Sequence, residues 1–98
     1  MNERIEFLAE LDSIIRQRIS SKADNSYTAK LAAEGNLRVA QKVGEEAVET
    51  VVAAASGAKD ELLQEAADLT YHLLVLLNLN EIPIEDVVTE LERRHRSR

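Results

Sequence analysis

The sequence predicts an all-α fold: an antiparallel helical bundle of four main helices plus a short one, completed by dimerisation. Apolar residues recur at three- and four-residue steps along most of the chain. No segment alternates Val, Ile or Thr with polar residues, and the three Gly and single Pro fall between the periodic segments. At 98 residues, 45% hydrophobic and 31% charged, the chain fits one small globular domain over 1–98.

The first half of the chain predicts a long helix, a loop and a short helix. The first helix carries one apolar face and ends near Ser20; that face is formed by Ile5, Leu8, Leu11, Ile15 and Ile19. Residues 21–25 form its exit loop. Ser26 is expected to cap a helix over 27–34 because its hydroxyl can accept from an unpaired backbone N–H. Gly35 then closes this helix.

The third predicted helix runs over 37–56, with Asn36 as its cap and Gly57 as its stop. It is expected to turn six small or branched apolar residues toward the core: Val39, Val43, Val48, Val51, Val52 and Ala55. Gly44 costs a helix interior about 1 kcal/mol relative to Ala. Its presence predicts a close approach by another helix or by the substrate.

The fourth predicted helix begins near Asp60, as its cap, and continues to about Asn80. It contains the run 73–77, which is apolar on every side and must be buried on every side. A chain of this size buries only about 60–65% of its unfolded surface, so a second subunit is expected to supply the missing cover. Pro83 fits the first turn of a last helix over 84–94, because its missing N–H is not needed there.

Two acidic clusters at helical spacing predict a metal site: Glu45-Glu46-x-x-Glu49 and Glu65-x-x-Asp68. Removing these five residues leaves 13 acidic against 12 basic residues, a net charge of −1 in place of −6. Like charges on one helical face repel, so a cation is the simplest compensation. Short loops favour antiparallel neighbours, and a hairpin of the third and fourth helices would place four carboxylates around one cavity.

Carboxylates without Cys or paired His favour a hard cation, and we expect Mg²⁺ because it leaves coordination positions open for water and phosphate. The Asp-rich spacing of a calcium loop is absent. The alternative is a solvated acidic face, which is common on exposed helices. Glu65 and Asp68 precede an apolar run on the same helix, however, and buried carboxylates are rarely tolerated without a partner.

Composition excludes several classes of function. The chain has no Cys, and therefore no disulfide framework or thiolate metal site. Its charge of −6, with one Phe, two Tyr and no Trp, disfavours nucleic-acid binding. No apolar run approaches the ~20 residues of a membrane span, and the amphipathic start does not resemble a signal peptide. We expect a cytoplasmic protein whose partners are a small metal-chelated molecule and a second copy of itself.

Three stretches carry a family resemblance: Ser26-Tyr27-Thr28, Lys42-Val43-Gly44-Glu45-Glu46 and Tyr71-His72-Leu73-Leu74-Val75-Leu76. With them, the chain resembles the phosphoribosyl-ATP pyrophosphatases of histidine biosynthesis, which lie within the wider all-α, MazG-like nucleotide pyrophosphatase superfamily. The resemblance implies Mg²⁺-assisted hydrolysis of phosphoribosyl-ATP to phosphoribosyl-AMP and pyrophosphate. The chain departs from many relatives at 32–33, where two Ala replace an aromatic residue.

The resemblance also implies site residues. Its metal ligands are Glu46, Glu49, Glu65 and Asp68. Glu45 either assists a second metal or acts on the attacking water, and which carboxylate is the base is left open. On the substrate side the resemblance implies Tyr27 and Thr28. Lys30, Arg38 and Lys42 are expected there for their charge, because a cation can contact a phosphate oxygen and the implied substrate also carries a ribose 5-phosphate.

Several of these residues also have a simpler structural interpretation. Lys42 is either a phosphate contact or the partner in a plain salt bridge. Tyr27 and Thr28 are otherwise a first helical turn. His72, four residues after Asp68, is expected to be a hydrogen-bonded core residue.

Two rival functions stay open. One is a house-cleaning pyrophosphatase acting on deoxynucleoside triphosphates, which shares the acidic motif. The other is a non-catalytic helical dimerisation module whose acidic faces serve solubility.

Overall fold

The computed structural model describes residues 3–21 and 26–97. Within these ranges the chain forms five helices and no strand: α1 Glu3–Ser21, α2 Tyr27–Ala33, α3 Asn36–Ser56, α4 Lys59–Leu79 and α5 Ile84–Arg96. The predicted all-α class is confirmed, and the predicted helix ends lie within two residues of the observed ones. Of the predicted exit loop, residues 22–25 lie outside the described part.

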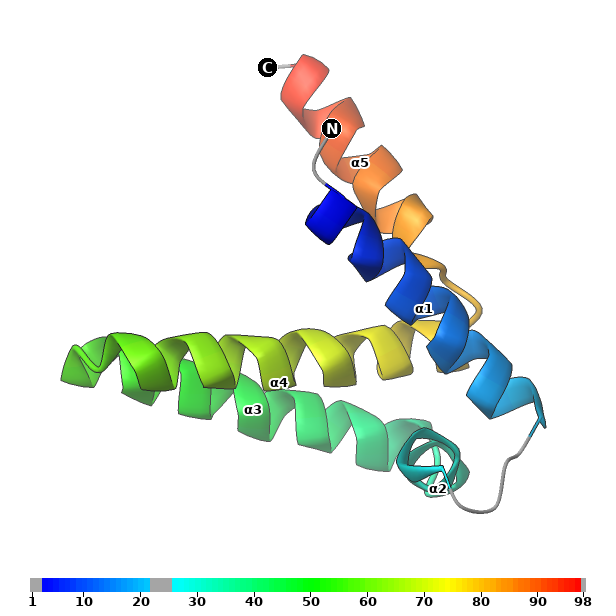
Figure 1. The fold of residues 1–98 in the computed structure, drawn as a ribbon, viewed down its shortest axis with the longest axis horizontal. Helices are drawn as coiled ribbons and strands as arrows, with labels where there is room; N and C mark the ends of the chain where they lie inside the picture. Colours follow the sequence, from blue (N-terminus) through cyan, green and yellow to red (C-terminus); the bar gives the residue numbers. More distant parts are fainter. Residues whose placement is uncertain (1–2, 22–25, 98) are drawn as a thin grey trace.

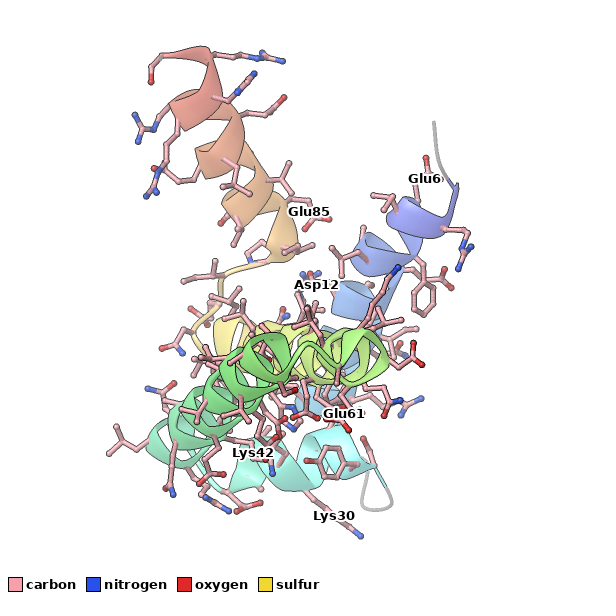
Figure 2. The ribbon with its side chains drawn as sticks, turned by 90° about the vertical axis from the view of Figure 1, so that its left-hand side faces the viewer. Glu6, Asp12, Lys30, Lys42, Glu61 and Glu85 are labelled. Atoms are coloured by element: carbon pink, nitrogen blue, oxygen red, sulfur yellow. The ribbon has the colours of Figure 1, made fainter. Side chains whose placement is uncertain are left out.

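A hairpin of α3 and α4 forms the long axis of the molecule (Figure 1). Helix α1 crosses α4 near its C-terminal end, and α2 packs beside the start of α3. Helix α5 turns away from the end of α4, contacts α1 and then diverges from it (Figures 1 and 2), and it has no buried side chain of its own. The molecule is therefore closed at one end of the hairpin and open at the other.

The core lies at the closed end. It contains Ile15 of α1, Leu31 of α2, Val39 of α3, and Leu74 and Val75 of α4, each at most 4% exposed. Four helices contribute to this cluster, so its burial fixes their relative positions. Full burial of such aliphatic side chains contributes about 1.5–3 kcal/mol each.

A polar network ties α1 to α4 beside this core. Asp12 is fully buried, and its carboxylate accepts from Asn78 Nδ2 at 2.8 Å and from Arg16 at 2.5 Å. Arg16 Nε also donates to Asn78 Oδ1 at 3.1 Å. Both carboxylate oxygens are thus paired, as a buried charge requires.

One predicted helix cap is confirmed and two are wrong. Ser26 Oγ accepts from the backbone N–H of Ala29 at 3.2 Å, as predicted. Asn36 is not a cap, because Gly35 at φ +99° turns the chain directly into α3, and the Asn36 side chain accepts from Asn80 instead. Asp60 lies inside the first turn of α4, after the cap Ala58.

The prediction that Val48, Val51 and Val52 face the core is wrong for the single chain. They are 60–66% exposed, because the second half of α3 is covered by α4 alone. The predicted close approach of a helix to Gly44 is also absent, since a Cβ placed there would meet no atom of another element within 4 Å. Among the described residues, no helix is long and apolar enough to cross a membrane.

Candidate metal centre

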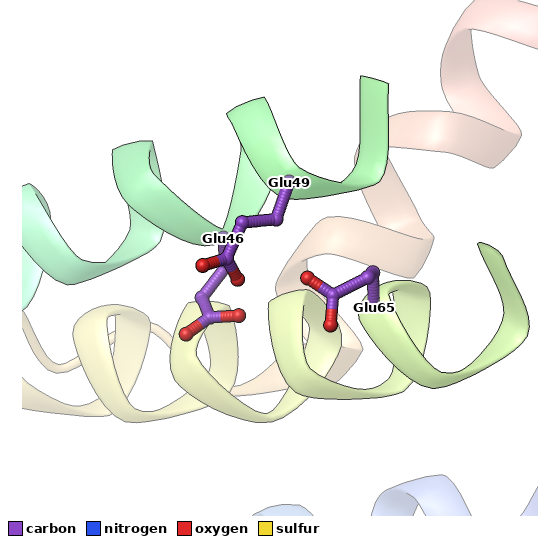
Figure 3. A group of neighbouring side chains, drawn as sticks. All are labelled: Glu46, Glu49 and Glu65. Carbon is purple, nitrogen blue, oxygen red and sulfur yellow. The ribbon is translucent and has the colours of Figure 1, made fainter. Parts of the chain in front are cut away.

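Three carboxylates from two helices meet on the α3–α4 hairpin. Glu46 and Glu49 extend from α3 toward Glu65 of α4, and one oxygen from each lies within 4.8 Å of the others (Figure 3). Residues three apart share a helical face, and the antiparallel turn brings the α4 face opposite. Helical spacing and the short loop between α3 and α4 therefore assemble this group.

Glu46 is the most constrained member of the group. Its side chain is 8% exposed and lies against Lys42, whose Nζ is 3.6 Å from Oε1. Its Oε2 is buried and has no hydrogen-bond partner among the described residues. A buried polar atom without a partner is costly, and a buried charge more so. A bound cation would satisfy this oxygen and relieve the repulsion from Glu49 and Glu65.

A groove of about 370 Å³ opens from the carboxylates toward the free end of the hairpin. Its lining residues are Val48, Glu49, Val52, Ala53, Glu61, Gln64 and Glu65. The α3 wall is mainly apolar, whereas the α4 wall is polar and acidic. Glu49 and Glu65 are therefore accessible to a small ligand from this side.

The structure gathers three of the predicted carboxylates and leaves two apart. Glu45 is exposed, and its Oε2 accepts from Gln41 Nε2 at 3.1 Å. Asp68 is exposed one turn after Glu65, and its short carboxylate does not join the group of oxygens within 4.8 Å. The sequence predicted four carboxylates around one cavity, whereas the structure brings three of them together.

The predicted cations differ in their placement. Lys42 lies next to the carboxylates through its contact with Glu46. Arg38 pairs with Glu34 at 3.3 Å near the start of α3. Lys30 extends from α2 to the outside of the molecule (Figure 2). Lys42 is thus the cation that the fold brings to the acidic group.

Tyr27 and Thr28 enter a polar and aromatic cluster between α2 and α4. Tyr27 Oη lies 3.1 Å from His72 Nε2, and the Thr28 hydroxyl contacts the Tyr71 hydroxyl. His72 is 6% exposed, and its Nδ1 lies 2.7 Å from the Asp68 carbonyl oxygen. The prediction that His72 is a hydrogen-bonded core residue is confirmed.

Sequence reasoning missed Glu61, and it gave Tyr71 no role in the site although Tyr71 belongs to a stretch that carries the family resemblance. Glu61 precedes Glu65 by four residues and lines the same groove, so helical spacing alone was sufficient to find it. Tyr71 meets Thr28 from 43 residues away. No local pattern signals that contact.

A family profile and individual relatives of known sequence indicate the same family for this chain. Residues 8–95 match the profile of the phosphoribosyl-ATP pyrophosphohydrolase family. A phosphoribosyl-ATP pyrophosphatase from Rhizobium etli is 53% identical over 87 residues, covering 89% of this chain and 81% of the relative. One from Pyrobaculum islandicum is 53% identical over 91 residues, covering 93% and 97%. Both relatives are similar over nearly the whole described fold.

Proposed function

This chain belongs to the phosphoribosyl-ATP pyrophosphohydrolase family, and we propose that it hydrolyses phosphoribosyl-ATP to phosphoribosyl-AMP and pyrophosphate, the second step of histidine biosynthesis. The observation that carries the proposal is the buried, unpartnered Oε2 of Glu46 beside Glu49 and Glu65. Anhydride hydrolysis needs neutralised phosphate charge and a positioned water. A cation held by these carboxylates would meet both needs.

We propose Mg²⁺ as that cation, with Glu46, Glu49 and Glu65 as ligands. All three offer oxygen, the donor that hard cations prefer, and together they leave positions open for water and phosphate. When bound, Mg²⁺ neutralises phosphate charge and lowers the pKa of a bound water. Asp68 stays a proposed fourth ligand, because it follows Glu65 by one turn on the same helix.

Other side chains would bind substrate and move protons. Lys42 Nζ, already beside Glu46, is proposed to contact a phosphate oxygen. Glu45, exposed and hydrogen-bonded only to Gln41 among the described residues, can either accept a proton from the attacking water or help to bind a second metal. Further substrate contacts are proposed for Tyr27, Thr28, Lys30 and Arg38, with Thr28 acting through Tyr71.

Pyrophosphate release from phosphoribosyl-ATP, with and without Mg²⁺, tests this function. The assay includes dCTP, dUTP and ATP at equal concentration. We expect release that depends on Mg²⁺ and is confined to phosphoribosyl-ATP. A preference for a deoxynucleotide would show that the chain is a house-cleaning pyrophosphatase. If no nucleotide released pyrophosphate, the non-catalytic dimerisation module would be favoured.

We further propose that two copies of the chain associate. The radius of gyration is 14.7 Å, against about 12.6 Å for a compact chain of this length. The accessible surface is 7207 Å², about 1,600 Å² more than the roughly 5,600 Å² expected for a compact monomer of this mass. A standard interface buries about 800 Å² per partner. The excess is therefore large enough for a stable dimer.

Exposed apolar side chains indicate where the second copy lies. On the hairpin they are Val48, Val51, Val52 and Leu63, and on α5 they are Val88 and Leu91, all 49–71% exposed. Such a concentration of exposed aliphatic residues is typical of an interface. Light scattering at micromolar concentration should give twice the chain mass, and the mass of a single chain would contradict the proposal.

A further inference from the structure

The hydrogen bonds of His72 fix the position of its proton. Nδ1 lies 2.7 Å from the Asp68 carbonyl oxygen, and a carbonyl oxygen only accepts. In the neutral imidazole, Nδ1 therefore carries the proton and donates, leaving Nε2 as an acceptor. The Tyr27 hydroxyl, 3.1 Å from Nε2, then donates to it. The result is a directed chain from Tyr27 of α2 through His72 to the backbone of Asp68 on α4.

Tyr27 is held in place although most of it is exposed. The residue is 57% exposed, yet its hydroxyl is hydrogen-bonded inward to His72. Its ring stacks on Tyr71, with centroids 6.1 Å apart and planes at 28°, and meets His72 edge-on. A half-exposed aromatic ring fixed at one edge is suited to stack against a flat ligand group, because little side-chain entropy remains to be lost.

The position of this ring suits a nucleotide bound at the carboxylates. His72 follows Glu65 by seven residues, which is two helical turns or about 10.5 Å along α4 on the same face. Phosphates at Glu65 and a base near Tyr27 would thus lie along one side of the helix.

We propose that His72 is a positioning residue that holds the Tyr27 ring in place to stack on the base of the nucleotide. This inference rests on the proposed function, since it assumes a nucleotide with its phosphates at Glu46, Glu49 and Glu65. It assigns to His72 no contact with the reacting atoms. Its effect is therefore on substrate affinity rather than on the rate of the bound complex.

Two substitutions separate the bonds of His72. His72→Asn keeps a donor for the Asp68 carbonyl, because Asn78 of the same helix and its cap residue Asn80 donate to carbonyls four residues earlier, at 2.9 and 2.8 Å. It removes Nε2, the ring atom that accepts from Tyr27. Tyr27→Phe keeps the ring and removes the hydroxyl. His95→Asn, at an exposed site on α5, makes the same chemical change elsewhere and is the control.

Steady-state kinetics with phosphoribosyl-ATP and saturating Mg²⁺ test the proposal. Each of His72→Asn and Tyr27→Phe should raise KM about three- to tenfold, the effect of losing one hydrogen bond, with kcat changed less than about twofold. The double variant should be no worse than either single one, because both remove the same bond. His95→Asn should leave both constants unchanged.

An unchanged KM in Tyr27→Phe, or additive effects in the double variant, would overturn the inference while leaving the proposed function intact. A wild-type protein that hydrolyses no nucleotide would overturn both, and this outcome is recognised before any variant is made. ¹⁵N NMR of the His72 ring gives a readout that is independent of activity. The Nδ1–H tautomer is expected, and a dominant Nε2–H tautomer would contradict the hydrogen-bond chain.

Discussion

Both ends of the α3–α4 hairpin carry apolar side chains, but the two ends differ in how other helices cover them. At the closed end, α1 and α2 pack over Val39, Leu74 and Val75, none more than 1% exposed. At the open end, Val52 and Leu63 are 60% and 71% exposed on the same two helices. Apolar character is therefore not enough to make a core, because a residue is buried only where another element reaches it.

The acidic group begins where the cover ends. Glu46 is buried, whereas Glu49 is exposed and borders the groove that leads to the open end. A rigid closed end can hold carboxylates in place, and an open end can admit a ligand or a second chain. We infer that the closed end supplies stability and the open end supplies binding.

Truncating one leucine at each end gives the largest expected difference. Leu74→Ala should cost about 2–5 kcal/mol of unfolding free energy through lost burial and a cavity. Leu63→Ala should cost less than about 0.5 kcal/mol in dilute, dissociated chains, because Leu63 is 71% exposed. Urea unfolding at low protein concentration measures both. Equal losses would show that the open end is covered within the single chain.

Placing a charge at the open end should weaken association. Val51→Asp, at a site 66% exposed, would bury an unpaired carboxylate in the proposed interface and raise the dimer dissociation constant at least about 100-fold. Sedimentation at several concentrations provides the measurement. Ser13→Asp adds the same charge on an exposed position of α1. An unaffected Val51→Asp dimer would place the interface elsewhere.

Magnesium should stabilise the hairpin through Glu46. At ten times its dissociation constant, a ligand bound only to the folded state adds about 1.4 kcal/mol. We expect that increase in thermal or urea unfolding of the wild type and none in Glu46→Gln, which lacks one anionic ligand. Stabilisation that persists in Glu46→Gln would mean that Mg²⁺ binds at another site.

The smallest expected effect is a surface one on α5, the helix that follows the hairpin. Hydrogen bonds from Arg93 and then Arg94 lower the pKa of Glu90 from 4.5 to about 2. Because the folded-state pKa is depressed, the stability that it contributes is complete above pH 4.5 and is lost as the pH falls toward 2. In Glu90→Gln, the melting temperature should therefore fall slightly less than in the wild type as the pH is lowered through this window. Added salt should shrink the difference, because the pair is exposed.

The sequence predicted the helices well because their signals are local. Apolar periodicity, Gly57 and Pro83 locate the breaks within two residues. The same locality explains the errors. The local sequence predicts Asn36 as a helix cap, but its side chain accepts a hydrogen bond from Asn80, 44 residues away. The exposure of Val51 depends on which elements reach the open end, and no pattern within α3 reports that.

The sequence predicted which residues belong to the candidate site better than it predicted how they are arranged. Spacing was enough to bring Glu46, Glu49 and Glu65 together. It did not distinguish them from Glu45, which turns along its own helix to Gln41. The partnership of Tyr27 with His72, 45 residues apart, required the packing of α2 on α4.

The rate of pyrophosphate release from phosphoribosyl-ATP, titrated with Mg²⁺ in the wild type and in Glu46→Gln, tests the role of the acidic group most directly. Glu85→Gln on α5 serves as the control for loss of one carboxylate. We predict that Glu46→Gln lowers kcat/KM by about 100-fold or more, the usual effect of removing an electrostatic contact in the transition state, and that Glu85→Gln leaves it unchanged. A Glu46→Gln protein with wild-type rate and wild-type Mg²⁺ dependence would contradict the assignment of this group as the metal centre.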